Sequence, residues 1–315
     1  MAERRYKYVF GPVPSRRLGR SLGVDLVPLK TCPFGCIYCQ LGPTSVKTAK
    51  RDVYVPTEEV LSEITDKLAS KPGCDYVTLS GSGEPTLHRD LGQIITAIKA
   101  MTDVPVAVLT NGALLSDPQV RKDLAKADLV LPSLDAGDAA TFRRVNRPCP
   151  EITFESLVEG LQAFRKEFPG TLRLEVFLVA DANTSESQVR RIKAIIDKVR
   201  PDRVDVNTVT RPPADEDARP VDSKTLERLR AILGPSARTI SPYAARSLRP
   251  GTLAPDDVVA VLTRRPCTID DMVEVFGCHR LELAKLLAAL TEEGRITSRF
   301  RDNKLHYLAS RNVQG

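Results

Sequence analysis

The feature that most constrains the fold is a regular alternation of short apolar runs with longer helical patterns across residues 21–210. A helix between two strands makes a connection far longer than a hairpin turn, and such connections join parallel strands. Strands are expected at residues 22–27, 76–80, 106–110, 129–134, 172–179 and 204–209. We therefore predict an α/β fold of six strand–helix units, built as an open barrel or as a doubly wound sheet.

The helices between these strands begin at recognisable residues. Thr57 precedes two acids, Pro118 stands early in its helix, Thr153 precedes an apolar stripe, and Ser185 has capping-box spacing to Gln188. In either architecture, ligands bind at the carboxyl ends of parallel strands. Candidate site residues are therefore sought directly after each strand.

Length and composition exclude several broad classes. The chain has 315 residues, 42% of them apolar and 27% charged, which suits one large and one small folded domain and excludes global disorder. No apolar run approaches the roughly 20 residues of a membrane helix, and the N-terminus does not resemble a signal peptide. We expect a cytoplasmic protein without a membrane partner.

Three cysteines directly after the first strand carry the strongest chemical signal. Cys32, Cys36 and Cys39 lie within eight residues, and thiolates at this density suit an iron–sulfur cluster or zinc. Structural zinc normally takes four ligands, and no fourth cysteine or histidine follows nearby. Three ligands leave one iron of a four-iron cluster open for a small molecule. A zinc site completed by a distant residue and buried structural thiols are the alternatives.

Polar or glycine-containing segments also follow the next three strands. Residues 80–86 combine two glycines with Glu84, a carboxylate that can accept an ammonium group. The segment lacks the Gly-Lys-Ser/Thr of a phosphate-binding loop and the third glycine of a dinucleotide-binding turn. Asn111 ends the third strand, and Ser133 and Asp135 end the fourth. These segments converge on one end of the predicted sheet.

The C-terminal residues follow a different pattern. We place a domain at 1–245, a linker at 246–254 and a second domain at 255–315, where three helices precede two strands joined at Asp302 and Asn303. This order is typical of a winged helix-turn-helix. His279 is expected to start the third helix rather than to bind a metal.

Positive charge is concentrated at the N-terminus. The chain carries a net charge of +6, whereas residues 1–51 alone carry +8. Arg16, Arg17 and Arg20 dominate this excess. Such a cluster can meet phosphate or carboxylate, or can lie in a solvated surface loop.

The Cys-x3-Cys-x2-Cys spacing at the start of the first strand–helix unit resembles the radical S-adenosylmethionine (SAM) superfamily. Residues 10–28 resemble a bacterial and archaeal branch of iron–sulfur oxidoreductases, grouped loosely with the enzymes that form the tricyclic wyosine base of tRNA. The resemblance covers roughly residues 8–245. It implies a partial (β/α)6 parallel-strand barrel, a [4Fe–4S] cluster and SAM.

The resemblance also implies roles for individual residues. Cys32, Cys36 and Cys39 would bind three irons, and the SAM amino and carboxylate groups would chelate the fourth. The cofactor-binding candidates are the remaining matched positions: Tyr38 for adenine, Gly81, Ser82, Gly83 and Glu84 for the methionine amino group, and Asn111, Ser133 and Asp135 for ribose or carboxylate. Weaker candidates are Arg143 or Arg144 for the carboxylate, and Asn207 and Thr208. Ser82 stands where the family has a glycine.

The implied activity is reductive SAM cleavage followed by hydrogen abstraction from a substrate, fed by an external one-electron donor. RNA, above all tRNA, is the leading substrate class, because of the basic N-terminal arm and the C-terminal domain. A peptide or protein is the second class. A non-catalytic iron–sulfur sensor that regulates DNA binding is the rival, but it leaves residues 81–86 and 110–112 without a role. Cys74, Cys149, Cys267 and Cys278 are spaced unlike an auxiliary cluster.

Overall fold

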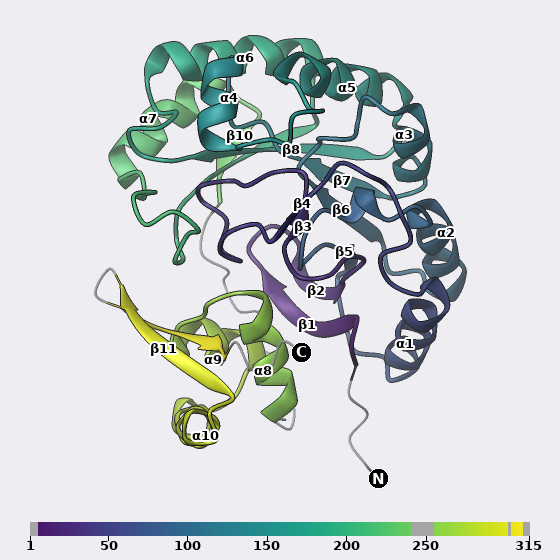
Figure 1. The fold of residues 1–315 in the computed structure, drawn as a ribbon, viewed down its shortest axis with the longest axis vertical. Coiled ribbons are helices and arrows are strands. Elements are labelled where there is room, and N and C mark those ends of the chain that lie inside the picture. Colours follow the sequence, from purple (N-terminus) through teal and green to yellow (C-terminus); the bar gives the residue numbers. More distant parts are fainter. Residues whose placement is uncertain (1–5, 241–254, 302–303, 311–315) are drawn as a thin grey trace.

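A computed structural model describes residues 6–240, 255–301 and 304–310 (Figure 1). The expected linker at 246–254 lies outside the described residues, as do residues 1–5 and the expected turn at Asp302 and Asn303. Within these ranges the chain forms a mostly parallel sheet with covering helices, followed by three helices and an antiparallel ribbon. The predicted α/β class is confirmed.

This sheet is parallel from β2 to β10, and among its described strands only β1 pairs antiparallel. In spatial order its strands are β1 (Val9–Ser15), β2 (Gly19–Val24), β5 (Tyr76–Leu79), β6 (Val106–Thr110), β7 (Leu129–Pro132), β8 (Thr171–Leu178), β9 (Arg203–Thr208) and β10 (Ala237–Thr239). The six predicted strands correspond to β2 and β5–β9. Sequence analysis missed the edge strands β1, whose glycine and prolines disfavour a strand, and β10, which has three residues.

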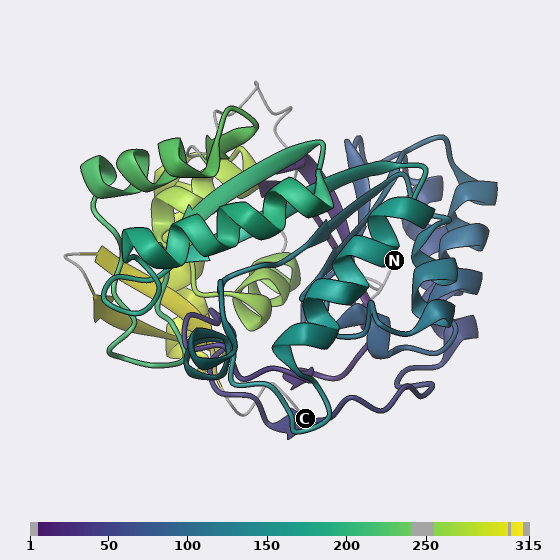
Figure 2. The ribbon, with the colours of Figure 1, turned by 90° about the horizontal axis from the view of Figure 1, so that it is seen from above.

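The helices between residues 57 and 233 form a layer outside the curved sheet (Figures 1 and 2). They are α1 (Thr57–Ala69), the short 3-10 helix η1 (Pro85–Leu87), α2 (Leu91–Met101), α3 (Pro118–Leu124), α4 (Ala139–Val145), α5 (Phe154–Glu167), α6 (Glu186–Val199) and α7 (Ser223–Leu233). This one-sided arrangement favours the open barrel over a doubly wound sheet.

Helix starts follow the capping chemistry only in part. The hydroxyls of Thr153 and Ser185 accept the amides of Ser156 and Gln188, at 3.0 and 3.3 Å, as expected for caps. The Asp117 carboxylate caps α3. Thr57 is the first residue of α1 rather than its cap.

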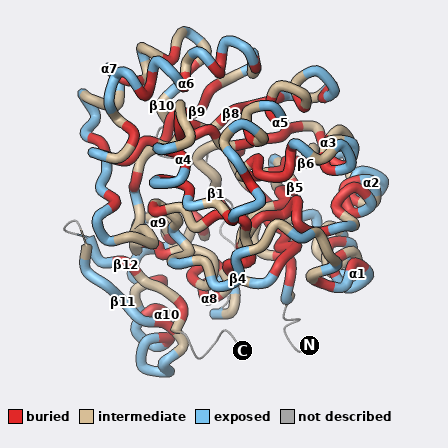
Figure 3. The backbone as a smooth tube through the Cα atoms, turned by 45° about the horizontal axis from the view of Figure 1, so that its top comes forward, coloured by how far each residue is buried: buried red, intermediate tan, exposed pale blue. Residues whose placement is uncertain are grey.

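Burial follows the layers of the fold. The strands and the inner faces of the helices are buried, whereas the outer helix faces are exposed (Figure 3). On α6, Val189, Ile192 and Val199 have no exposed surface, and each such side chain contributes about 1.5–3 kcal/mol relative to an exposed one.

The C-terminal elements pack against the edge of the sheet. They are α8 (Pro255–Arg264), α9 (Ile269–Phe276), α10 (Arg280–Glu292), β11 (Ile296–Arg301) and the antiparallel partner of β11, β12 (Lys304–Ala309). Their apolar core includes Val13 of β1, and α8 lies beside β1 in Figure 1. The ring of His279 accepts the amide of Leu281 at 3.3 Å, which confirms it as the residue that starts α10.

Among the helices that the structure describes, none is both long enough and apolar enough to cross a membrane.

Candidate functional site

A pocket of about 350 Å³ lies where the carboxyl ends of β5, β6 and β7 meet residues 32–41, and we call it the site pocket. Nine of the eleven main cofactor and metal candidates line it: Cys32, Cys36, Tyr38, Cys39, Gly81, Gly83, Glu84, Asn111 and Ser133. Ser82 and Asp135 are buried and do not line it. A more open depression beside Lys99, Asp128 and Arg165 holds none of the predicted residues.

Each of the three thiols receives a hydrogen bond from a nitrogen. Asn111 Nδ2 lies 3.3 Å from Cys32 Sγ, Asn146 Nδ2 lies 3.6 Å from Cys36 Sγ, and Lys30 Nζ lies 3.0 Å from Cys39 Sγ. Donors of this kind stabilise negative charge on sulfur and tune iron–sulfur sites. Sequence analysis did not identify Lys30 or Asn146. The sequence signal that could have identified Lys30 was its position two residues before the first cysteine.

The three thiols are partly buried. Burial raises the pKa of Cys32 to about 12 and raises the pKa of Cys36 well above its ordinary value. Buried thiolates therefore need compensating positive charge, which bound iron would provide. Within the described ranges, no group of three or more His, Cys, Asp or Glu side chains is close enough to hold a single metal ion. Three sulfurs that bond separate irons of one cluster do not need that closeness.

The glycines after β5 are required by packing against the residues that lead into the cysteines. Gly81 has a φ of +129°, and a Cβ there would lie 2.1 Å from Asp25 Oδ1. A Cβ on Gly83 would lie 2.1 Å from the Thr31 carbonyl oxygen. Backbone hydrogen bonds from Lys30 to Ser82 and from Glu84 to Thr31 join the two segments, at 2.6 and 3.1 Å. These contacts fix the cysteine-bearing segment against residues 81–84.

Glu84 is buried, and its carboxylate orientation is fixed. Oε1 accepts the amide and hydroxyl of Thr86, at 3.1 and 2.6 Å, and the hydroxyl of Thr110 at 2.6 Å. Oε2 accepts only the amide of Asn111, at 2.7 Å, among the described residues. Burial raises the pKa of Glu84, and these hydrogen bonds oppose the rise. A carboxylate has about four acceptor positions, so Oε2 retains capacity for a further donor.

Tyr38 is held from behind the pocket surface by Asp135. The Tyr38 hydroxyl donates to Asp135 Oδ2, and the same oxygen accepts Asn146 Nδ2 at 2.8 Å. The Tyr38 ring stacks on Phe177 with centroids 4.0 Å apart. Burial raises the pKa of Asp135 to about 6. Asp135 therefore positions Tyr38 instead of facing the pocket.

Some of the other candidate side chains line the pocket, and others lie outside it. Asn111 points its amide nitrogen at Cys32, and its Oδ1 accepts the Ala113 amide at 2.8 Å. Asn207 lines the pocket, whereas Thr208 bonds the Leu178 carbonyl and does not line it. Arg143 and Arg144 are exposed on α4 and lie outside the pocket. They are therefore poorly placed for a ligand in this pocket.

The C-terminal helix α8 contributes to the pocket and to its support. Arg264 Nε donates to Asp25 Oδ2 at 2.7 Å, and Asp25 Oδ1 accepts the Ser82 amide at 2.7 Å. The Arg264 guanidinium also lies 4.0 Å from the centre of the Phe10 ring. One buried carboxylate thus links α8 to residues 81–84. The only sequence signal for Asp25 was its charge within the apolar run 22–27.

Of the three N-terminal arginines, two line the site pocket and one does not. Arg16 and Arg17 line the site pocket, so they do not lie in a solvated loop. Arg20 donates to the Pro72 carbonyl at 3.3 Å, outside the pocket. Cys74, Cys149, Cys267 and Cys278 also lie outside it.

Comparisons with known proteins concern the family and the fold of this chain. A model of the Radical SAM superfamily matches residues 26–200. The protein named GTPase Obg of Brachyspira hyodysenteriae is 38% identical over 305 residues, 96% of this chain, but the match spans only 45% of that relative. A UPF0026 protein of Synechocystis sp. is 38% identical over 205 residues, covering 65% of this chain and 76% of that protein.

Solved structures share the fold at low identity. Streptococcus suis SuiB bound to the precursor peptide SuiA aligns with a TM-score of 0.53 at 17% identity, over 71% of this chain and 50% of SuiB. TYW1 with a lysine-pyruvate adduct bound aligns with a TM-score of 0.51 at 18% identity, over 71% and 75%. At these identities the likeness concerns the fold alone.

Proposed function

Because the chain belongs to the radical SAM superfamily, whose model matches residues 26–200, we propose that the site pocket binds a [4Fe–4S] cluster and SAM and that the protein is a radical enzyme. The superfamily uses both cofactors. The observation that carries the proposal is that three thiols, each with its own nitrogen donor, line one pocket with Glu84. Cys32, Cys36 and Cys39 are the proposed iron ligands.

The proposed SAM contacts follow from the groups that face the pocket. Glu84 Oε2 accepts the amino group, because it has acceptor capacity and a fixed orientation. Gly81, Gly83, Asn111 and Ser133 form the adjoining surface, and Tyr38 offers an aromatic face for adenine. Ser82 and Asp135 act from behind by fixing this segment and the Tyr38 hydroxyl.

Bound in this pocket, the cluster and SAM supply one-electron reductive cleavage of SAM and hydrogen abstraction from a substrate. The chain's own residues hold the ligands, donate hydrogen bonds to the thiolates and limit access of water. Because the other described cysteines lie outside the pocket, we assign electron delivery to an external donor.

We propose RNA, with tRNA first, as the substrate class. The three helices and ribbon of residues 255–301 and 304–310 have the order of a winged helix-turn-helix and adjoin the pocket. Exposed basic residues on the ribbon include Arg299 and Lys304, although Arg295 is paired with Asp256. A modified peptide is the second candidate, in line with the peptide bound to SuiB. The domain boundary and the linker at 246–254 are part of this proposal.

The test is anaerobic reconstitution with iron and sulfide, followed by dithionite and SAM, with 5′-deoxyadenosine as the readout. The enzyme proposal expects 5′-deoxyadenosine and an iron content near four per chain. A fully loaded cluster with no SAM cleavage, together with duplex DNA binding that follows cluster state, would instead support the sensor. RNA that co-purifies and is released by nuclease would favour RNA over peptide.

A further inference from the structure

One side of the site pocket is lined by arginines from distant parts of the chain. Arg16 and Arg17 come from the turn between β1 and β2, Arg211 follows β9, and Arg265 follows α8. We call these four residues the arginine wall. None of these four arginines follows a strand that carries a proposed SAM contact.

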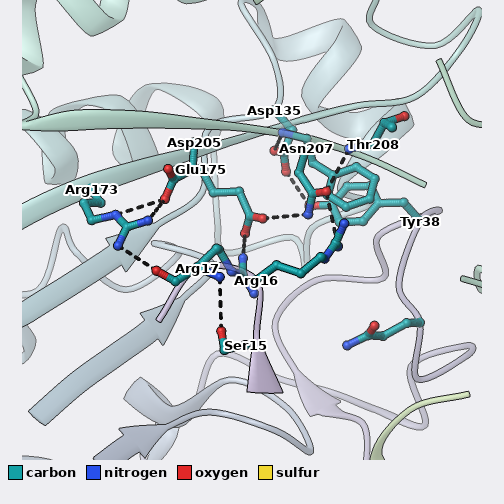
Figure 4. A network of polar contacts seen from close by, with 12 residues as sticks. Ser15, Arg16, Arg17, Tyr38, Asp135, Arg173, Glu175, Asp205, Asn207 and Thr208 are labelled. Carbon is teal, nitrogen blue, oxygen red and sulfur yellow. Dashed lines mark hydrogen bonds and ion pairs between the residues drawn. The ribbon is translucent and has the colours of Figure 1, made fainter. Parts of the chain in front are cut away.

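The turn that carries Arg16 and Arg17 is anchored inside the barrel by ion pairs and hydrogen bonds. Arg173 Nη1 donates to the Arg17 carbonyl at 3.0 Å, and Arg173 is paired with the buried carboxylate of Asp205 at 2.5 Å (Figure 4). This network fixes the turn, so that the Arg16 and Arg17 side chains extend towards β8 and β9 (Figure 4). The arginines are therefore held in the pocket by the fold.

Glu175 provides the carboxylate on this side of the pocket, and both of its oxygens already have partners. Glu175 Oε2 forms an ion pair with Arg17 at 2.5 Å, and Glu175 Oε1 accepts Asn207 Nδ2 at 3.0 Å. Arg16 reaches only the neutral amide oxygen of Asn207, at 3.4 Å. Arg211 reaches only the neutral amide oxygen of Gln40, at 3.2 Å. Within the described ranges, neither Arg16 nor Arg211 forms an ion pair.

The surroundings of the Arg16 and Arg211 guanidinium groups favour binding of an anion. Arg211 Nε is buried without a hydrogen-bond partner among the described residues. Burial, together with the charges of Arg211 and Arg17, lowers the pKa of Arg16 to about 10. Burial and the charges of Arg265 and Arg17 lower the pKa of Arg211. An oxyanion between these groups would relieve their repulsion and supply the missing acceptor.

We propose that Arg16 and Arg211, with charge added by Arg265, form a subsite for an anionic group of the substrate, a phosphate or a carboxylate. This proposal rests on the proposed function in calling the bound molecule a substrate. The anion site itself does not depend on SAM cleavage. Guanidinium groups bind phosphate and carboxylate through paired N–H donors. Because α8 and Arg265 complete this wall, the C-terminal elements contribute to substrate binding.

The test uses the reconstituted 315-residue chain and two probes, inorganic pyrophosphate and succinate, titrated by calorimetry at low salt. Wild-type protein binds at least one of them, and Arg16→Gln and Arg211→Gln each weaken that binding by at least about tenfold. Arg190→Gln, which alters an exposed arginine on α6 outside the pocket, is the matched control and stays within about twofold. Preference for pyrophosphate identifies a phosphate site, and preference for succinate identifies a carboxylate site.

Several results would overturn the subsite. They are binding of neither probe to wild type, equal weakening in Arg190→Gln, and displacement of the probe by SAM, which would assign the arginines to the cofactor. Melting curves and 5′-deoxyadenosine formation without substrate are recorded for each variant. If a glutamine variant is misfolded, the charge-retaining Arg16→Lys or Arg211→Lys must keep binding within about tenfold of wild type. Loss of SAM cleavage with intact probe binding would refute the enzyme and leave the anion site standing.

Discussion

The two sides of the site pocket differ in how well their polar groups are satisfied. On the side of Cys32, Cys36, Cys39 and Glu84, which we call the cofactor wall, each thiol has a nitrogen donor and Glu84 accepts four hydrogen bonds. On the arginine wall, Arg16 and Arg211 have only neutral acceptors within the described residues. The first side is preorganised for ligands of fixed geometry, whereas the second carries charge that a ligand must compensate.

The two sides also differ in how the chain builds them. The cofactor wall comes from residues 32–39 and from the ends of successive strands, whereas the arginine wall joins positions 16, 211 and 265. Cofactor chemistry is thus encoded locally, and the region assigned to the substrate depends on the arrangement of the whole chain.

The largest expected effect follows from removing a thiol of the cofactor wall. Cys36→Ala should lose most of the iron and reduce 5′-deoxyadenosine formation by at least roughly a hundredfold, because a cluster held by two thiolates is unstable. Iron analysis and visible absorption after anaerobic reconstitution measure it. Cys278→Ala, outside the pocket, is the control and keeps its iron. A Cys36→Ala variant with full iron content would disprove the ligand assignment.

The next effect concerns the link between α8 and residues 81–84. Arg264→Ala leaves the buried carboxylate of Asp25 without its ion-pair partner, and the unfolding free energy should fall by about 3–5 kcal/mol. Denaturant unfolding measures it. The double variant Asp25→Asn with Arg264→Ala should recover part of that loss, because no charge is then buried unpaired. A loss below about 1 kcal/mol would mean that this pair does not couple the C-terminal elements to the pocket.

A pair of isosteric variants compares the two sides directly. Glu84→Gln should weaken SAM binding by about tenfold or more, because a charge-assisted hydrogen bond is lost, while Glu175→Gln leaves SAM binding unchanged. Glu175→Gln also releases the charge of Arg17 and should strengthen pyrophosphate binding several-fold. Calorimetric titration of both variants with both ligands provides the measurement. Equal responses would show that the two sides do not bind separate ligands.

The smallest expected effect is a pH dependence behind Tyr38. Burial raises the pKa of Asp135 to about 6, above the roughly 3.9 of an unfolded chain, so the native state binds more protons between these values. Its contribution to stability is full below about pH 4 and is lost as pH rises through about 6. The unfolding free energy of wild type relative to Asp135→Asn should therefore fall over this range, by at most about 1.4 kcal/mol per pH unit. A difference independent of pH would mean that Asp135 is ionised throughout.

The sequence by itself determined the six parallel strands, the order of the C-terminal elements and the cysteine-bearing segment. These features depend on local periodicity, on capping and on spacing within short stretches, which act between near neighbours in the chain. It also predicted ligand binding at the ends of β5, β6 and β7, because parallel strands share one carboxyl end.

Only the tertiary structure decided which polar residues face the pocket. Asp135 and Glu84 both follow strands, yet only Glu84 lines the pocket, because Asp135 accepts hydrogen bonds from Tyr38 and Asn146. The edge strand β1, whose prolines and glycine concealed it, folds back so that Arg16 and Arg17 enter the barrel. Long-range packing, such as that between Asp25 and Arg264, which lie 239 positions apart, has no local pattern from which it can be predicted.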